Sequence, residues 1–146
     1  MRSDRWRPAW QDRRVTSWRP GWDAFPEDLL GFWTERHLCT LTTLREDGRP
    51  HVVPVGVTVD PDERCAWVIT SGTSRKAQNI RRTPTLAVCQ VDGRRWSTIE
   101  GRGEVLEDEA AVRRAMERYA TRYRPPRPNP LRVAVRIEVD RFLGNA

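Results

Sequence analysis

Residues 41–56, with the sequence LTTLREDGRPHVVPVG, carry the strongest fold signal in the chain. The stretches Leu38–Leu44 and His51–Val59 around the central turn are rich in the Leu, Thr and Val residues common in strands. The Asp-Gly pair at 47–48 tolerates the positive φ that a tight hairpin turn requires. This part of the chain therefore predicts two antiparallel strands joined by a short turn.

Two residues interrupt the second of these strands. Pro54 cannot donate a ladder hydrogen bond, and Gly56 has no side chain to shield the backbone. We expect a bulge at this point, or a place where another group approaches the strand closely.

The rest of the sequence adds four strands and three helices. Short β-rich runs bounded by turn residues predict strands at 65–70, 85–91, 95–104 and 133–139. Helices are expected from Asp23 to about 36, from 75 to 82 and from 107 to 123, the last with apolar residues at three- and four-residue spacing. Tight turns between strands favour antiparallel pairing over βαβ units. The predicted fold class is mainly β with peripheral helices, arranged as an antiparallel barrel.

Composition divides the chain into an arm and one domain. Residues 1–22 hold six Arg, two Asp and four Trp without a helical or strand period, so we interpret them as an N-terminal arm. Residues 23–146 are long enough for one domain with its own core. Because only the arm argues for nucleic-acid binding, we expect neither a nucleic-acid nor a membrane partner.

Cysteine usage indicates a reducing compartment. Cys39, Cys65 and Cys89 are odd in number, lie in apolar runs and form no C-x-x-C. With only two histidines in the chain, a zinc site is not expected. No apolar run approaches the roughly 20 residues of a membrane span, and the first residues do not resemble a secretory signal. We predict a cytoplasmic protein without a metal.

The basic residues single out one side chain. Of the 26 basic residues, 25 are Arg and only Lys76 is Lys. Lys76 ends the run SGTSRK at 71–76, which places hydroxyls, a glycine and cations at the start of a predicted helix. Backbone N–H groups at a helix start, together with hydroxyls and a cation, form an anion site. The alternative is an N-cap followed by a solvated basic turn.

The familiar catalytic motifs are missing from the sequence. It has no G-x-S-x-G, no H-E-x-x-H and no recognisable Cys/His pair. His51 could serve as a base, although a lone His is more often a surface or hydrogen-bonded residue. A planar ring could lie along the strand edge near Val52–Gly56 with its phosphate at Lys76, unless the irregular strand is only a structural bulge. Hydride transfer suits such a site, because there the cofactor supplies the chemistry.

Several segments resemble a known family. The hairpin at 41–56 and the turn and helix at 71–81 are similar to those of the pyridoxamine-phosphate-oxidase-like (FMN-binding) split-barrel superfamily. The runs CQVDGRRW at 89–96, EGR at 100–102 and RYRPPRPNP at 122–130 resemble its actinobacterial F420-dependent branch, and in particular the F420-dependent biliverdin reductases. The resemblance covers about residues 27–144.

The resemblance implies a homodimer of split β-barrels with two cofactors at the interface. It implies cofactor contacts from three regions of one subunit and from a second subunit. These are His51, Val52, Val53 and Pro54 at the ring; Ile69, Thr70, Ser71, Gly72 and Thr73 at ring and ribityl; Lys76 and Ala77 at the phosphate, with Asn79 close by; and Gln90, Val91 and Trp96 from the second subunit.

The resemblance also implies a reaction, in which reduced coenzyme F420 gives a hydride to an unsaturated acceptor such as biliverdin or another tetrapyrrole. The oligoglutamate tail of F420 and the propionates of such an acceptor favour arginines. The candidates are Arg75, Arg81, Arg82, Arg95 and Arg127. No residue is assigned as catalytic. The alternatives are an FMN-dependent oxidoreductase on the same fold, a non-catalytic carrier of F420 or tetrapyrrole, and a basic nucleic-acid-binding protein.

Overall fold

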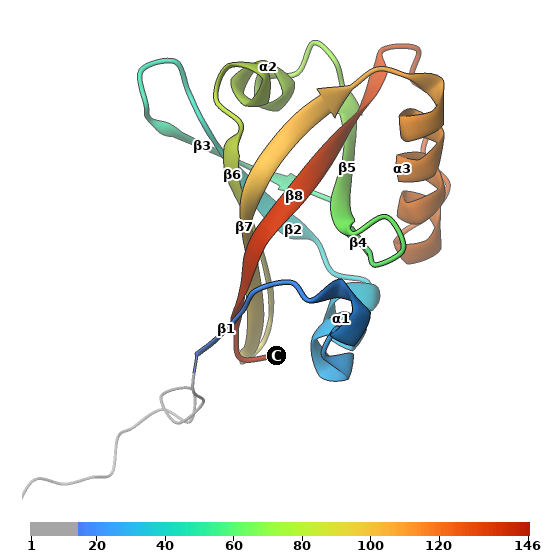
Figure 1. Ribbon diagram of the computed structural model, residues 1–146. Coiled ribbons are helices and arrows are strands. Elements are labelled where there is room, and N and C mark those ends of the chain that lie inside the picture. The colour runs from blue at the N-terminus through green and yellow to red at the C-terminus, as the bar shows by residue number, and fades with distance from the viewer. Residues whose placement is uncertain (1–14) are drawn as a thin grey trace, which may run out of the picture.

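The computed structural model describes residues 15–146, which form eight strands, three α-helices and one short 3-10 helix (Figure 1). The strands are β1 (Thr16–Trp18), β2 (Cys39–Leu44), β3 (Pro50–Val55), β4 (Thr58–Asp60), β5 (Cys65–Ser71), β6 (Thr85–Asp92), β7 (Arg95–Leu106) and β8 (Arg132–Gly144). The helices are η2 (Trp22–Ala24), α1 (Glu27–Thr34), α2 (Arg75–Arg82) and α3 (Glu109–Arg122). The six predicted strands and three predicted helices lie in the expected order, with β7 and β8 longer than expected, whereas β1, η2 and the division of 51–59 into two strands were not predicted.

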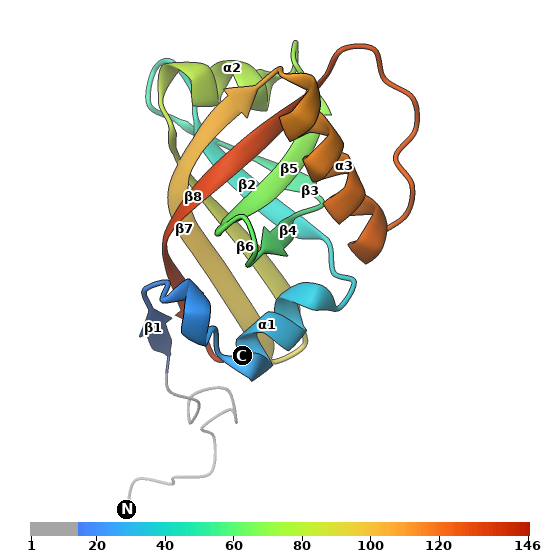
Figure 2. The same cartoon turned by 45° about the vertical axis from the view of Figure 1, so that its right-hand side comes forward.

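The strands form one sheet in the order β3-β2-β6-β7-β8-β5-β4, with β1 added beside β8. All neighbouring strands are antiparallel. The two end strands of this order, β3 and β4, are consecutive in the chain and are joined by Gly56 and Val57. The sheet therefore curls into a barrel that stays open between β3 and β4 (Figure 2). This confirms the predicted fold class, a mainly β antiparallel split barrel with peripheral helices.

The single strand expected over 51–59 is in fact two strands. β3 pairs with β2, β4 pairs with β5, and the chain changes partner between them. Pro54 is tolerated because β3 is an edge strand, which has a pairing partner on one side only. The irregularity that Pro54 and Gly56 predicted is thus a change of partner strand and not a bulge.

Helices cover the barrel at three places. α2 lies at one end over β2 and β7, α1 lies at the opposite end, and α3 runs along β5 and β4 (Figures 1 and 2). Within the described residues, no helix combines the length and apolar character needed to cross a membrane.

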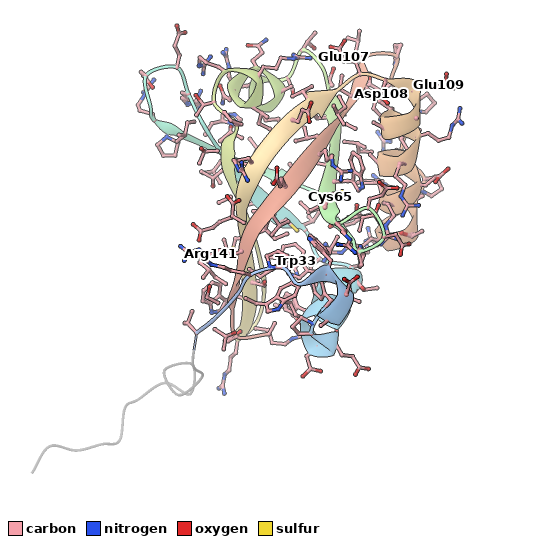
Figure 3. All side chains as sticks on the ribbon, in the orientation of Figure 1. Trp33, Cys65, Glu107, Asp108, Glu109 and Arg141 are labelled. Carbon is pink, nitrogen blue, oxygen red and sulfur yellow. The ribbon has the colours of Figure 1, made fainter. Side chains whose placement is uncertain are left out.

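The interior of the barrel is filled by alternate strand residues, which point to one face of the sheet. Leu41, Val88, Ile99 and Ile137 have no exposed surface. Trp33 of α1 closes the end opposite α2 and donates its indole N–H to Ser97 Oγ at 3.0 Å (Figure 3). The core therefore holds the strands that carry the candidate site in fixed positions.

Part of the predicted arm pairs with the barrel. β1 lies against the end of β8, and the ring of Trp18 contacts those of Phe25 and Phe142 at centroid distances of 4.4 and 5.4 Å. The sequence does not predict this strand, because three residues are too few to show the two-residue period of a strand. The register of β1 is set by its pairing with β8. Residues 1–14 lie outside the described residues, so the boundary between arm and domain at residue 22 stays a prediction.

Candidate functional site

The loop before α2 has the geometry of an anion site. Ser74 is the N-cap of α2, and its Oγ accepts hydrogen bonds from the backbone N–H of Ala77 at 3.3 Å and from Thr70 Oγ1 at 3.1 Å. The N–H groups of Arg75 and Lys76 belong to the first helical turn, where backbone donors lack intrahelical partners. These donors and the positive end of the helix dipole are therefore available to an anion beside Lys76.

Two side chains of α2 hold this loop in place. Arg81 donates to the carbonyl of Gly72 at 2.6 Å and forms an ion pair with Glu107 at 3.0 Å. Gln78 donates to the carbonyl of Thr73 at 3.2 Å. Figure 3 labels Glu107 close to the start of α3. Because its carbonyls are already bonded, the loop needs no ligand to keep its shape.

Lys76 lies partly buried at the start of the helix. Burial lowers the pKa of its ammonium from the ordinary value of 10.5. Among residues 15–146, the carboxylates form their ion pairs with other cations and none with Lys76. A partly desolvated ammonium without a counter-charge is unfavourable until an anion binds. The environment of Lys76 therefore favours an anionic ligand.

A cleft of about 420 Å³ opens beside Lys76. One wall comes from the end of β3, from β5 and from Lys76, and the other comes from α3 and the segment that follows it. Figure 2 shows that segment leaving the far end of α3 and returning alongside it to β8. The lining residues are Pro54, Val55, Gly56, Ile69, Thr70, Lys76, Tyr119, Arg124, Pro126, Arg127, Asn129 and Arg132. Of the predicted site residues, the cleft thus brings together Pro54, Ile69, Thr70 and Lys76.

The second wall of the cleft was largely missed by sequence reasoning. The sequence predicts an anion-binding role for Arg127 of this wall, but it does not connect Tyr119, Arg124 or Arg132 with the site. The four prolines at 125–130 did predict a stiff, extended segment. They could not indicate which strands that segment lies against, because this depends on tertiary packing.

The arginines of the second wall lack acidic partners. In the part of the chain that the structure describes, Arg124, Arg127 and Arg132 form no ion pair, whereas Arg102 and Arg141 on the barrel surface do. Arg132 donates instead to the backbone carbonyl of Arg127. No Asp or Glu among residues 15–146 lines the cleft. The cleft therefore carries a positive potential that attracts anions.

The other arginines predicted to hold anionic groups have different environments. Arg81 and Arg95 form ion pairs with carboxylates, and Arg82 donates to a backbone carbonyl and to a side-chain amide. Arg75 is exposed at the start of α2, and the hydrogen bond that it donates to Gln78 is long, at 3.4 Å. Only Arg75 and Arg127 of the five therefore remain free for an anionic ligand.

The ring contacts predicted on β3 lie on two faces of the strand. His51 and Val53 face inward, because His51 is opposite the buried Thr43. Val52 and Pro54 point outward and are exposed. Of these four residues only Pro54 lines the cleft. The four side chains therefore do not present a single surface to a ring.

Residues around α2 take two different positions. The hydroxyls of Ser71 and Thr73 lie 3.3 Å from each other at the surface. Ala77 and Asn79 are fully buried. The amide of Asn79 donates to Thr43 Oγ1 at 3.0 Å, which fixes α2 on β2. Asn79 therefore positions the helix and does not expose its amide to a ligand.

Gln90, Val91 and Trp96 lie outside the cleft of their own protomer. Gln90 is 1% exposed, and its amide accepts from Arg122 at 2.6 Å and donates to the carbonyl of Phe32 at 3.0 Å, so it is not available to a ligand. Val91 and Trp96 pair across β6 and β7 on the outer face of the sheet. Their contact with a cofactor in a second subunit stays a prediction.

A buried guanidinium holds the junction between β3 and β4, where Gly56 lines the cleft. Arg122 donates to the carbonyls of Glu35 at 2.8 Å and Val57 at 2.5 Å, besides its bond to Gln90. The hydroxyl of Tyr123 donates to the carbonyl of His37 at 2.7 Å and accepts from the N–H of Val57 at 3.1 Å. These bonds tie the junction between β3 and β4 to the end of α3. Sequence gave no signal for this role, since an Arg at a helix end is usually solvated.

Comparisons with known proteins agree with this geometry. Residues 25–145 match the family model described as pyridoxamine 5'-phosphate oxidase. Over 120 residues the chain is 53% identical to an F420H(2)-dependent biliverdin reductase of Mycobacterium tuberculosis, covering 82% of this chain and 88% of that protein.

Two solved structures have a similar fold. A conserved hypothetical protein of Mycobacterium tuberculosis is 27% identical with a TM-score of 0.69, covering 82% of this chain and 83% of that one. A protein described as an F420 reductase is 22% identical with a TM-score of 0.64, covering 81% and 98%. The match to the family model extends over most of the chain. The chain belongs to the pyridoxamine 5'-phosphate oxidase-like split-barrel family.

Proposed function

We propose that this chain is an F420-dependent oxidoreductase, which passes a hydride from the reduced deazaflavin to a CH=CH group of an unsaturated acceptor while water supplies the proton that completes the reduction. Biliverdin is the first candidate for the acceptor. The relative at 53% identity, described as an F420H(2)-dependent biliverdin reductase, supports both the cofactor and the acceptor. The structural observation that carries the proposal is the cleft itself. Lys76 and three arginines line one cavity without a carboxylate among them.

The side chains of the cleft fit a flavin-type cofactor with an anionic tail. The first turn of α2 and the ammonium of Lys76 supply donors for a phosphate. Pro54 and Ile69 supply apolar contact for a ring. On the opposite wall, Arg124 and Arg127 suit the carboxylates of an oligoglutamate or of propionate groups.

When bound, the deazaflavin supplies the hydride, and the protein supplies position and electrostatics. The hydroxyl of Thr70 already donates to Ser74, so it is not free. The ring of Tyr119 also lines the cleft, and within residues 15–146 its hydroxyl has no hydrogen-bond partner. Tyr119 is therefore available to orient a polar group of an acceptor.

We also propose that the protein works as a homodimer. The outer face of β3, β2, β6 and β7 carries Val52, Pro54, Val91 and Trp96. Val52 is 57% exposed and Val91 is 63% exposed, and exposed apolar side chains grouped on one face mark an interaction surface. A second copy seated on this face would bring its Val91 and Trp96 near the edge strand β3. We assign cofactor binding to residues 23–146 and treat residues 1–22 as an arm.

Turnover tests this function directly. The purified protein is mixed with reduced F420 and biliverdin, and the return of the oxidised deazaflavin absorbance is followed alongside loss of the biliverdin band. We expect oxidation of F420 only when protein and acceptor are both present. Binding of F420 without turnover of biliverdin or another tetrapyrrole would identify a carrier. Oxidation of reduced FMN in place of reduced F420 would identify an FMN enzyme of the same fold.

A further inference from the structure

His51 occupies an unusual position on the inner face of β3. It lies directly opposite Thr43, whose hydroxyl accepts the amide of Asn79 and so joins β2 to α2. Side chains opposite each other in an antiparallel pair lie about 5 Å apart at Cβ. The imidazole therefore lies next to the contact that joins β2 to α2.

One ring nitrogen of His51 is buried without a partner. Nδ1 has no hydrogen bond among residues 15–146. A buried polar atom in this state is unfavourable unless a ligand or solvent satisfies it. The atom thus marks a place where a hydrogen-bonding group is expected from outside the chain.

The charges that face His51 are all positive. Arg45 follows β2, and Arg75 and Lys76 open α2, and all three act electrostatically on the imidazole. No carboxylate faces it, and none of the three cations forms an ion pair within residues 15–146. The unpartnered imidazole nitrogen thus lies in the positive field of Arg45 and of the two cations that open α2.

We propose that His51 belongs to the phosphate end of the site, donates a hydrogen bond to the bound phosphate, and takes up a proton when the anion binds. This inference rests on the proposed function and gives His51 a place different from the ring contact expected from the sequence. Arg45 and Arg75 act with Lys76 as the cations around the same phosphate.

The direction of the coupling follows from the electrostatics. Burial, followed by Arg45, Lys76 and Arg75, lowers the pKa of His51 from 6.5, so the free protein favours the neutral imidazole. A phosphate oxygen at the imidazole favours the charged form and raises its pKa. The pKa of His51 is therefore higher in the complex than in the free protein. Between these two values, the affinity for the anion rises as the pH falls. Each unit between the two pKa values corresponds to a tenfold change in affinity.

Histidine NMR in the full chain tests this, because the chain has only two histidines. His37 stacks on Phe32 and bonds to Glu35, so the His37→Gln variant assigns both signals and serves as a matched control. The pKa of His51 is measured free, with oxidised F420 and with inorganic phosphate. We expect the anion to raise the pKa of His51 by about one unit. The pH dependence of F420 binding should persist in His37→Gln and vanish in His51→Gln.

The outcomes separate this inference from the proposed function. If F420 binds while the pKa of His51 stays unchanged, the role of His51 is overturned and the function stands. If inorganic phosphate raises the pKa of His51 but F420 does not bind, the phosphate role stands and the choice of cofactor is wrong. If neither ligand binds, both proposals fail. Loss of F420 binding in His51→Gln counts as support for the role of His51 only if circular dichroism shows that the variant is folded.

Discussion

A side chain at Gly56 would place its Cβ 2.8 Å from Cε2 of Tyr119 and 2.9 Å from Cε2 of Tyr123. The rings of Tyr119 on α3 and of Tyr123 directly after it therefore close onto the backbone where β3 ends and β4 begins. This contact sets the spacing between the two walls of the cleft, because Gly56 and Tyr119 both line it. The glycine that sequence marked as a point of close approach is approached by the protein's own helix.

Gly56→Ala should destabilise the fold and disturb the cleft. The new methyl group forces the tyrosine rings to shift, and overpacking of this kind costs about 1–3 kcal/mol. Urea unfolding measures the change. Gly31→Ala is the matched control, since a Cβ at Gly31 meets nothing within 4 Å and alanine favours a helix. Equal stability of the two variants would show that the rings do not constrain Gly56.

Arg122→Met should cost about 3 kcal/mol of unfolding free energy, because buried acceptors lose their donor. The carbonyls of Glu35 and Val57 and the amide oxygen of Gln90 all lose their bonds to the guanidinium. Arg113→Met removes an exposed ion pair with Glu109 and should change stability by less than about 0.5 kcal/mol. A loss below about 1 kcal/mol for Arg122→Met would contradict the role of the buried guanidinium.

Arg127→Ala should weaken F420 binding by a few-fold and reduce its dependence on salt. The guanidinium is exposed and forms no ion pair with the described part of the chain, so its attraction for an anion is modest and screened. The substitution keeps the backbone carbonyl that Arg132 uses, so the segment should retain its shape. Arg141→Ala on the barrel surface, which loses only its contact with Glu100, is the control. An unchanged salt dependence in Arg127→Ala would remove Arg127 from the site.

Val91→Glu should convert the proposed dimer into a monomer. A charge at a 63% exposed apolar position on the outer face is tolerated in a monomer but disfavoured in a buried interface. Light scattering gives the mass directly. Val15→Glu, which charges an apolar residue of similar exposure next to β1, is the control and should stay dimeric. A wild-type monomer that binds F420 would contradict the two-subunit site.

Local sequence signals predicted the fold and one wall of the site. The Asp-Gly turn at 47–48 and the alternation in 133–139 are properties of neighbouring residues, and they fixed the hairpin and β8. Lys76 was identifiable because its surroundings and its rarity are both visible in the chain. The loop and helix start that carry it have the predicted form.

The second wall could not be predicted because it depends on long-range packing. The position of Arg124 and Arg132 depends on where an extended proline segment lies after leaving α3, which no local pattern encodes. The same holds for Arg122, whose partners just after α1, on β6 and at the β3–β4 junction are distant in sequence. The resemblance groups Gln90 with Val91, whereas in the structure these neighbouring side chains point to opposite faces of β6.

The most direct test of the cationic cleft is a fluorescence titration of oxidised F420 with wild-type protein and with Lys76→Ala, with FMN as competitor. Saturable quenching is expected for the wild type, with FMN a weaker competitor. Lys76→Ala should bind roughly 10- to 150-fold more weakly, because it loses a charge-assisted hydrogen bond of about 1.5–3 kcal/mol. Equal affinity of the two proteins for F420 would contradict the assignment of Lys76 and of the cleft beside it.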